Sequence, residues 1–202
     1  MLRDVLTRAG VFIDESWFVL WPHQAETWAE IGRPLRIPKD KSWKENDRPP
    51  SCALYAEMDV ARREVRAEWH DTWNQEETWK HLQTVIKEYE QRGTRYLIVF
   101  WDHGPWHTAS SVRRRVRAHN LEVKRQRRAG EDGGVRVLLF YLPIRSPWLM
   151  PLEGVFGQTK RAIGTEQRAT LGDLQAAVDQ RLEYRNTRST RHHYHPTERQ
   201  SA

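Results

Sequence analysis

The stretch Tyr96 to Asp102, YLIVFWD, decides the fold of this chain. Six consecutive apolar residues that end abruptly at a carboxylate are typical of a strand covered by protein on both faces. A second run of this kind spans Val135 to Leu142. Because buried strands that alternate with helices require parallel crossovers, these runs predict a mixed α/β sheet with helices on both faces.

The segments around these two strands predict the rest of the sheet. The apolar run GVFIDESWFVLW at 10–21 indicates a first strand, and rough alternation at 51–59 and 64–73 indicates a hairpin. Helices are expected at 75–92, 109–119, 152–163 and 171–184, with a charged loop at 124–134. This order of five strands and four helices resembles that of the ribonuclease H-like folds. In such sheets the functional cleft lies at the carboxyl ends of the parallel strands.

Length and composition set limits on the class of protein. With 202 residues, 38% of them hydrophobic, the chain is long enough for one main core. Its formal charge of +6 is compatible with a polyanionic partner. A single cysteine, Cys52, excludes an internal disulfide and any CxxC zinc site. Charged residues near the start and the lack of a bilayer-length apolar run predict an intracellular protein without a membrane partner.

The expected domain organisation is simple. Residues 1–186 are predicted to form one catalytic domain, with an irregular insertion at about 22–50 and a basic loop insertion at about 122–134. The remaining residues, 187–202, are basic and rich in histidine and are expected to form a solvated tail.

Three carboxylates stand where packing alone does not explain them. Asp14 interrupts an apolar strand, Asp102 ends another, and Glu153 lies in the first turn of a helix after a proline-rich turn. Taken singly, each has a structural explanation, such as capping a turn or complementing a helix dipole. Asp14 is the hardest to dismiss, because a carboxylate among apolar residues costs desolvation energy unless a cation or hydrogen-bond donors compensate. Together, three hard oxygen ligands suit two Mg²⁺ or Mn²⁺ ions about 3.5–4 Å apart, as in enzymes of phosphoryl transfer.

The motifs around these carboxylates closely resemble those of the Tc/mariner superfamily of transposases, and especially its bacterial IS six-thirty group. The motifs are IDESWF at 13–18, TWAEIGRP at 27–34, WDHGPWH at 101–107 and LPIRSPWLMPLEGVFGQTKR at 142–161. The resemblance implies a DDE catalytic domain of ribonuclease H-like fold that cuts and joins DNA strands to move an insertion sequence. Asp14, Asp102 and Glu153 would be its catalytic residues and metal ligands.

The same resemblance implies the cofactors and partners. Two Mg²⁺ or Mn²⁺ ions are expected, with double-stranded DNA at the transposon ends and at the target. The active complex is expected to be a homodimer or higher oligomer in the bacterial cytoplasm, associated with the nucleoid. The family also has a helix-turn-helix region before the catalytic domain, so an upstream-encoded portion of this kind is a possible partner.

Two positions depart from the family pattern, since His103 and Met150 stand where asparagine is usual. The spacing between Asp102 and Glu153 is also longer than usual. His103 and His107 lie close to Asp102 in sequence and are predicted to support it, although a hydrogen-bonded turn is the commoner reason for such histidines. Glu15 is expected to point to the opposite strand face from Asp14 and to be dispensable.

Ten basic residues are predicted to contact DNA phosphates, because they lie in sequence near the expected metal site. A solvated basic face is the alternative explanation. The residues are Arg113, Arg114, Arg115, Arg117, Lys124, Arg125, Arg127, Arg128, Lys160 and Arg161.

Two other functions remain open at this stage. The chain could be an inactive remnant or a regulatory DNA-binding fragment of a split transposase gene, although the intact carboxylate triad favours catalysis. It could also be a stand-alone ribonuclease H-like nuclease, although the motif from Ser146 to Glu153 is typical of transposases.

Overall fold

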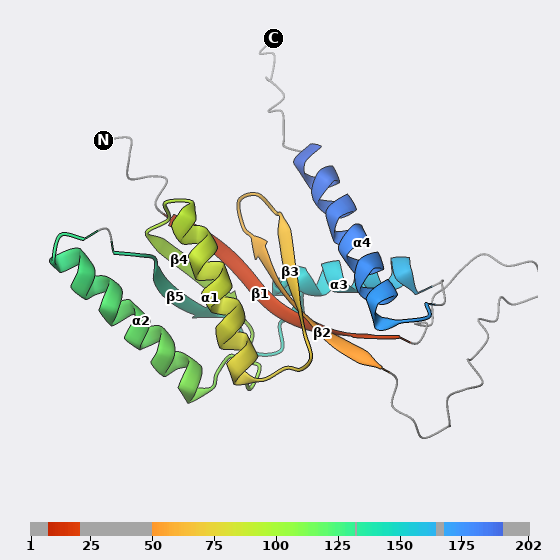
Figure 1. Cartoon of the computed structure of the whole chain (residues 1–202), viewed down its shortest axis with the longest axis horizontal. Coiled ribbons are helices and arrows are strands. Elements are labelled where there is room, and N and C mark those ends of the chain that lie inside the picture. Colours follow the sequence, from red (N-terminus) through yellow and green to blue (C-terminus); the bar gives the residue numbers. More distant parts are fainter. Residues whose placement is uncertain (1–7, 21–49, 132, 165–167, 192–202) are drawn as a thin grey trace, which may run out of the picture.

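A five-stranded mixed sheet forms the centre of the protein in the computed structural model, which describes residues 8–20, 50–131, 133–164 and 168–191 (Figure 1). The strand order is β3-β2-β1-β4-β5. The strands are β1 (Arg8–Val19), β2 (Ser51–Asp59), β3 (Val65–His70), β4 (Tyr96–Trp101) and β5 (Arg136–Tyr141). Four α-helices cover the sheet, so the predicted fold class is confirmed.

The pairing of β1 sets the position of the site described below. One edge of β1 pairs with β4 in parallel, from Arg8 opposite Tyr96 to Phe12 opposite Phe100. The other edge pairs with β2 antiparallel, from Val11 opposite Asp59 to Val19 opposite Ser51. β5 then pairs with β4 in parallel. Because β1 continues beyond this pairing, Asp14 lies close to the carboxyl end of β4, which Asp102 directly follows.

Helices α1 (Gln75–Gln91) and α2 (Ser110–Arg128) cover one face of the sheet, and α3 (Pro151–Ile163) and α4 (Leu171–Arg191) cover the other. Alternation along β1 divides its side chains between the two cores. Val11 and Ile13 pack with α1 and α2, whereas Phe18 packs with α3 and α4. Successive side chains of a strand point to opposite faces, so Asp14 and Glu15 also face different layers.

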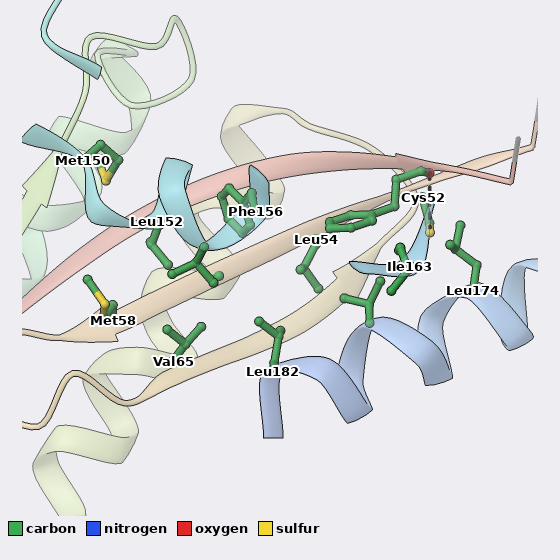
Figure 2. Packing of buried hydrophobic residues seen from close by; sticks show 14 of the residues in the cluster. Cys52, Leu54, Met58, Val65, Met150, Leu152, Phe156, Ile163, Leu174 and Leu182 are labelled. Carbon is green, nitrogen blue, oxygen red and sulfur yellow. Dashed lines mark hydrogen bonds between the residues drawn. The ribbon is translucent and has the colours of Figure 1, made fainter. Parts of the chain in front are cut away.

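The α3 and α4 face is held by an apolar cluster (Figure 2). Leu152 and Phe156 of α3 pack with Leu54 of β2, and Leu182 of α4 joins the same cluster. The only cysteine, Cys52, is buried there, and its Sγ lies 3.9 Å from the carbonyl oxygen of Phe18. This cluster fixes α3 against the sheet and thereby positions Glu153.

Helix α1 follows its sequence signals closely. The Oδ1 of Asn74 accepts hydrogen bonds from the backbone N–H groups of Glu76 and Glu77 at 2.8 and 2.9 Å, which caps the helix N-terminus. Leu82 is fully buried against the sheet. Gly93, with φ of 73°, ends the element in a left-handed conformation that other residues rarely adopt.

The predicted charged loop at 124–134 is wrong in its first half, because α2 continues to Arg128. The expected helix end at residue 119 is therefore also wrong. The segment from His119 to Arg128 is rich in Arg, Lys, Gln, Leu and Glu, which are good helix formers, and buried Val123 extends the apolar face begun by Val112 and Val116. Most of the predicted basic loop insertion at 122–134 is thus helical.

The expected helix end near residue 184 is also wrong, because α4 runs to Arg191, so residues 187–191 of the predicted tail are helical. Residues 192–202 lie outside the described residues. So do the motif at 27–34 and nearly all of the expected insertion at 22–50. Among the described residues, no helix has the length and apolar character needed to cross a membrane.

Candidate active site

Three carboxylates from separate parts of the sequence line one cavity of about 310 Å³. Asp14 comes from β1, Asp102 directly follows β4, and Glu153 lies in the first turn of α3. The two aspartates meet because β1 and β4 are parallel neighbours, whose carboxyl ends lie at the same edge of the sheet. The structure therefore brings together the three residues that the sequence singled out as catalytic.

Asp14 is buried and incompletely bonded. Its Oδ1 accepts a hydrogen bond from the backbone N–H of Glu15 at 2.9 Å, whereas its Oδ2 is buried without a hydrogen-bond partner among the described residues. Burial, followed by the charge of Glu15, raises the pKa of Asp14 to about 8, and the charges of Glu153 and Asp102 act in the same direction. The ionised side chain lacks compensation in this environment, which a cation could supply.

Asp102 differs from Asp14 because hydrogen-bond donors stabilise its ionised carboxylate. Its Oδ1 accepts a hydrogen bond from the backbone N–H of Gly104 at 2.8 Å and lies 2.6 Å from Nδ1 of His107. The hydrogen bond from His107 is the main reason that the pKa of Asp102 is lowered. A Cβ atom on Gly104 would lie 3.1 Å from Oδ1 of Asp102, so a side chain there would crowd the carboxylate.

His107 is buried between two carboxylates. Its Nε2 lies 3.0 Å from Oε1 of Glu15, and its ring stacks on Trp101 with centroids 4.9 Å apart. Burial alone would lower the pKa of His107, but the charges and hydrogen bonds of Glu15 and Asp102 outweigh burial and raise it to about 9. The Nε1 of Trp106 donates to Oε2 of Glu15 at 2.9 Å. A continuous hydrogen-bonded chain thus runs from Glu15 through His107 to Asp102.

The two histidines predicted to support Asp102 therefore have different positions. His107 contacts Asp102 directly from behind the cavity. His103 is exposed in the cavity wall, with its ring 5.5 Å from that of Tyr141. The sequence did not point to the contact of Glu15 with His107, because it joins residues 92 positions apart.

Glu153 is exposed in the first turn of α3, where a negative charge complements the helix dipole. Lys160 is half-buried near the carboxylates, with Nζ 5.3 Å from the centre of the Phe18 ring. Burial lowers the pKa of Lys160, whereas the charges of Glu153 and Asp14 act to raise it. Arg161, the other basic residue predicted on α3, is exposed. Lys160 thus balances part of the negative charge of the site.

The connection between β5 and α3 forms one wall of the cavity. Arg145 lies in this wall with φ of 60°, a left-handed conformation that is uncommon for residues other than glycine. Ile144, also in the wall, and nearby Trp148 are 71% and 76% exposed. An arginine held in a strained conformation beside the carboxylates is a candidate phosphate contact, and its backbone conformation gave no signal in the sequence.

The predicted phosphate-binding residues on α2 do not form one uniform surface. Arg113, Arg117 and Lys124 share a groove of about 430 Å³ between α2 and β5. Arg114 and Arg128 are exposed elsewhere on the helix. The groove therefore gathers three of the predicted phosphate-binding residues of α2 on one surface.

Three other residues of this set have partners within the protein. Arg115 forms an ion pair with Glu76 at 2.7 Å, and Arg125 forms one with Glu122 at 2.9 Å. Arg127 donates hydrogen bonds to three backbone carbonyls, those of Arg95, Gly133 and Gly134, and stacks over the Tyr96 ring. Arg127 is thus placed to hold the end of α2 against the sheet.

The donor set of the cavity fits a hard divalent cation. Carboxylate oxygens are the ligands that Mg²⁺ and Mn²⁺ prefer, and no donor from residues that the structure describes reaches the buried Oδ2 of Asp14. Asp14, Asp102 and Glu153 are the residues that could hold such ions.

Comparisons with known proteins agree with this geometry. Residues 10–175 match the model of the family described as DDE superfamily endonuclease. The chain is similar to the Mos1 strand transfer complex (TM-score 0.63, 18% identity, covering 94% of this chain and 51% of that one). It is also similar to a pre-cleavage Mos1 transpososome (TM-score 0.60, 16% identity, 93% and 54% covered).

A third similarity is to the simian T-cell lymphotropic virus intasome in complex with a PP2A regulatory subunit (TM-score 0.50, 11% identity, 90% and 49% covered). No curated protein matches the chain. These structural similarities confirm the ribonuclease H-like fold. The chain spans about half the length of the Mos1 chains.

Proposed function

Because the chain belongs to the DDE superfamily endonucleases, we propose that it is the catalytic domain of a transposase of the bacterial IS six-thirty group that cuts DNA and joins strands to move an insertion sequence. The observation that carries this proposal is the convergence of Asp14, Asp102 and Glu153 on one cavity, with an oxygen of Asp14 buried and unpaired.

In this proposal the three carboxylates hold two Mg²⁺ or Mn²⁺ ions. Two such ions, when bound, would activate the attacking water or 3′-hydroxyl and would stabilise the leaving oxygen of an in-line displacement. The chain itself supplies orientation. His107 and the backbone of Gly104 fix the rotamer of Asp102, and the apolar cluster under α3 fixes the position of Glu153.

The DNA would lie across the cavity, with its phosphates near basic residues on both sides. Arg113, Arg117 and Lys124 offer contacts in the groove beside α2, Lys160 and Arg145 offer contacts next to the carboxylates, and Arg161 is exposed on α3. Such contacts position a duplex without reading its sequence. We therefore propose that recognition of the transposon ends depends on a helix-turn-helix portion and on assembly of a dimer or higher oligomer at the nucleoid.

A cleavage assay tests the proposal. Duplex DNA carrying an element end is incubated with the protein in Mn²⁺, Mg²⁺ or EDTA, together with a substrate whose 3′-hydroxyl end is already exposed. Cleavage or joining should require the metal and should fall by more than about 100-fold in each of Asp14→Asn, Asp102→Asn and Glu153→Gln, because each change removes a negative ligand.

Glu122→Gln is the matched control, since Glu122 is an acid on α2 whose contacts are with Gln126 and Arg125. Robust cleavage by Asp102→Asn, or activity that survives EDTA, would contradict the mechanism. A folded parent protein that binds DNA but neither cuts nor joins it would favour the remnant or regulatory alternative. Cutting without any joining of the exposed end would favour a stand-alone nuclease.

A further inference from the structure

A second group of potential metal ligands lies under α1, on the opposite face of the sheet from Asp14. Glu68 and His70 are two residues apart on β3, so their side chains share a face, and His81 comes from α1. One ligand atom from each of these three residues lies within 4.8 Å of the other two. Within the described part of the chain, this is the only group of three histidine, cysteine or acidic residues with that spacing.

The atoms that converge can be named. The Oε1 of Glu68 lies 3.3 Å from Nε2 of His70 and 2.5 Å from Nδ1 of His81. Zinc bonds of about 2.0–2.1 Å in a tetrahedron place ligand atoms about 3.3 Å apart, so small rotations of the side chains would complete the arrangement. Within the described parts of the chain, the Nε2 of His70 is buried and lacks a hydrogen-bond partner, although it faces this carboxylate.

Each histidine also has a carboxylate near its other ring nitrogen. The Nδ1 of His70 lies 2.6 Å from Oε2 of Glu77, and the Nε2 of His81 lies 3.4 Å from Oε2 of Glu57. Histidines that ligate metals usually donate their second N–H to a carboxylate or carbonyl, which fixes the tautomer and the ring orientation. The carboxylate of Glu77 thus stands where the outer shell of a metal site requires it. That of Glu57 lies near the corresponding position beside His81, whose Nε2 forms no hydrogen bond within the described residues.

We propose that Glu68, His70 and His81 bind one Zn²⁺ ion that ties the edge strand β3 to helix α1. Two imidazoles and one carboxylate form a borderline donor set that suits zinc better than Mg²⁺, which prefers oxygen ligands. The side chain of Glu68 is 33% exposed, so water can reach the fourth position. The two metal centres therefore differ in chemistry and in location.

Binding can be measured with Co²⁺, which replaces Zn²⁺ and gives visible absorption that reports coordination. The protein for this experiment is the full chain, stripped of metal. The substitution Asp14→Asn weakens metal binding by the carboxylate cavity, and alanine at positions 192, 193 and 195 removes the histidines of the tail. One equivalent of Co²⁺ should bind, and Zn²⁺ should displace it. Saturating Zn²⁺, at about 100 times Kd, should raise Tm by about 5–10 °C.

Substitutions then locate the ion. Glu68→Gln and His70→Gln should weaken binding by more than about 100-fold, and Glu77→Gln by about 10–100-fold, because it only orients His70. Glu64→Gln is the matched control, since Glu64 precedes the same strand, is 32% exposed and pairs with Arg66. Circular dichroism in EDTA checks that each variant is folded.

Two results would overturn the proposal. If the folded parent binds neither Co²⁺ nor Zn²⁺ at this spectroscopic site, the residues form only a hydrogen-bonded ion-pair cluster. If Glu68→Gln binds the ion as tightly as Glu64→Gln does, the ion lies elsewhere.

Discussion

The two faces of β1 handle buried charge in opposite ways, although the residues involved are neighbours. Asp14 faces the cavity with one oxygen unpaired, whereas both oxygens of Glu15 are bonded, to His107 and to the indole of Trp106. Burying a carboxylate is costly, and hydrogen-bonded partners offset part of that cost. The difference indicates that the face toward α3 is prepared for a ligand from solution, while the face toward α1 provides rigid support.

The largest expected effect is on the stability of the protein without metal. The raised pKa of Asp14 means that ionising this group destabilises the fold, by a penalty that is absent below pH 4 and fully present above pH 8. Asp14→Asn should therefore raise the free energy of unfolding in EDTA at pH 8, by at most about 5 kcal/mol at about 1.4 kcal/mol per pKa unit. Urea unfolding at pH 8 and at pH 4 measures both limits.

Asp102→Asn provides the comparison for that experiment and should have the opposite sign. The lowered pKa of Asp102 means that its ionised form stabilises the fold above the unfolded pKa, and that this contribution is lost as pH falls through the folded value. Because the side chain is half-exposed, the loss should be only about 1 kcal/mol. Equal effects of the two substitutions would remove the distinction between the two carboxylates.

The second prediction concerns the supporting face. Glu15→Gln should lower the rate of metal-dependent cleavage by about 10–100-fold, because it weakens the hold of His107 on Asp102. Raising the Mn²⁺ concentration should recover part of the loss if the effect acts through a metal ligand. Normal cleavage by Glu15→Gln would instead agree with the expectation from sequence that this residue is dispensable.

The sequence predicted most of the fold and the three cavity carboxylates for identifiable reasons. The run from Tyr96 to Trp101 is too apolar for anything but a covered strand, and Asp102 marks its end. The length of α2 was not predicted, because its last turns carry one buried apolar residue, Val123, on an otherwise charged surface. Strong helix formers outweighed the charged appearance of the segment.

The network of Glu15 and the cluster of Glu68, His70 and His81 were not predicted either. The contact of Glu15 with His107 joins residues 92 positions apart, and the cluster depends on how α1 packs over the edge strand β3. Alternation places Glu15 on the opposite face from Asp14, but it does not say what that face contains.

A smaller effect is expected in DNA binding. Replacing Arg113, Arg117 and Lys124 together by alanine should reduce the slope of log K against log salt by up to about 2.7, since each phosphate contact contributes about 0.9. Arg127→Ala should leave that slope nearly unchanged and lower Tm, because Arg127 bonds backbone carbonyls. An unchanged slope in the triple variant would place the DNA away from the groove.

The smallest expected effect is that of His103→Ala. His103 is exposed in the cavity wall and contacts Tyr141 but, in the described structure, bonds none of the three carboxylates. We expect the cleavage rate to fall by a few-fold, which corresponds to less than about 1.4 kcal/mol of activation free energy. A loss as large as that of Asp102→Asn would show that His103 takes part in the reaction directly.

The alternation along β1 has a consequence for how this gene can change. Asp14 of the cavity and Glu15 of the supporting network are consecutive residues. The face to which each side chain points is therefore set by the number of residues between Arg8 and Asp14. Deleting one residue there, with the start of the strand still paired to β4, would turn Asp14 toward α1 and bring Glu15 to the cavity. A substitution in β1 can alter one face of the strand alone, whereas inserting or deleting one residue would disrupt both the carboxylate cavity and the packing of the hydrophobic core.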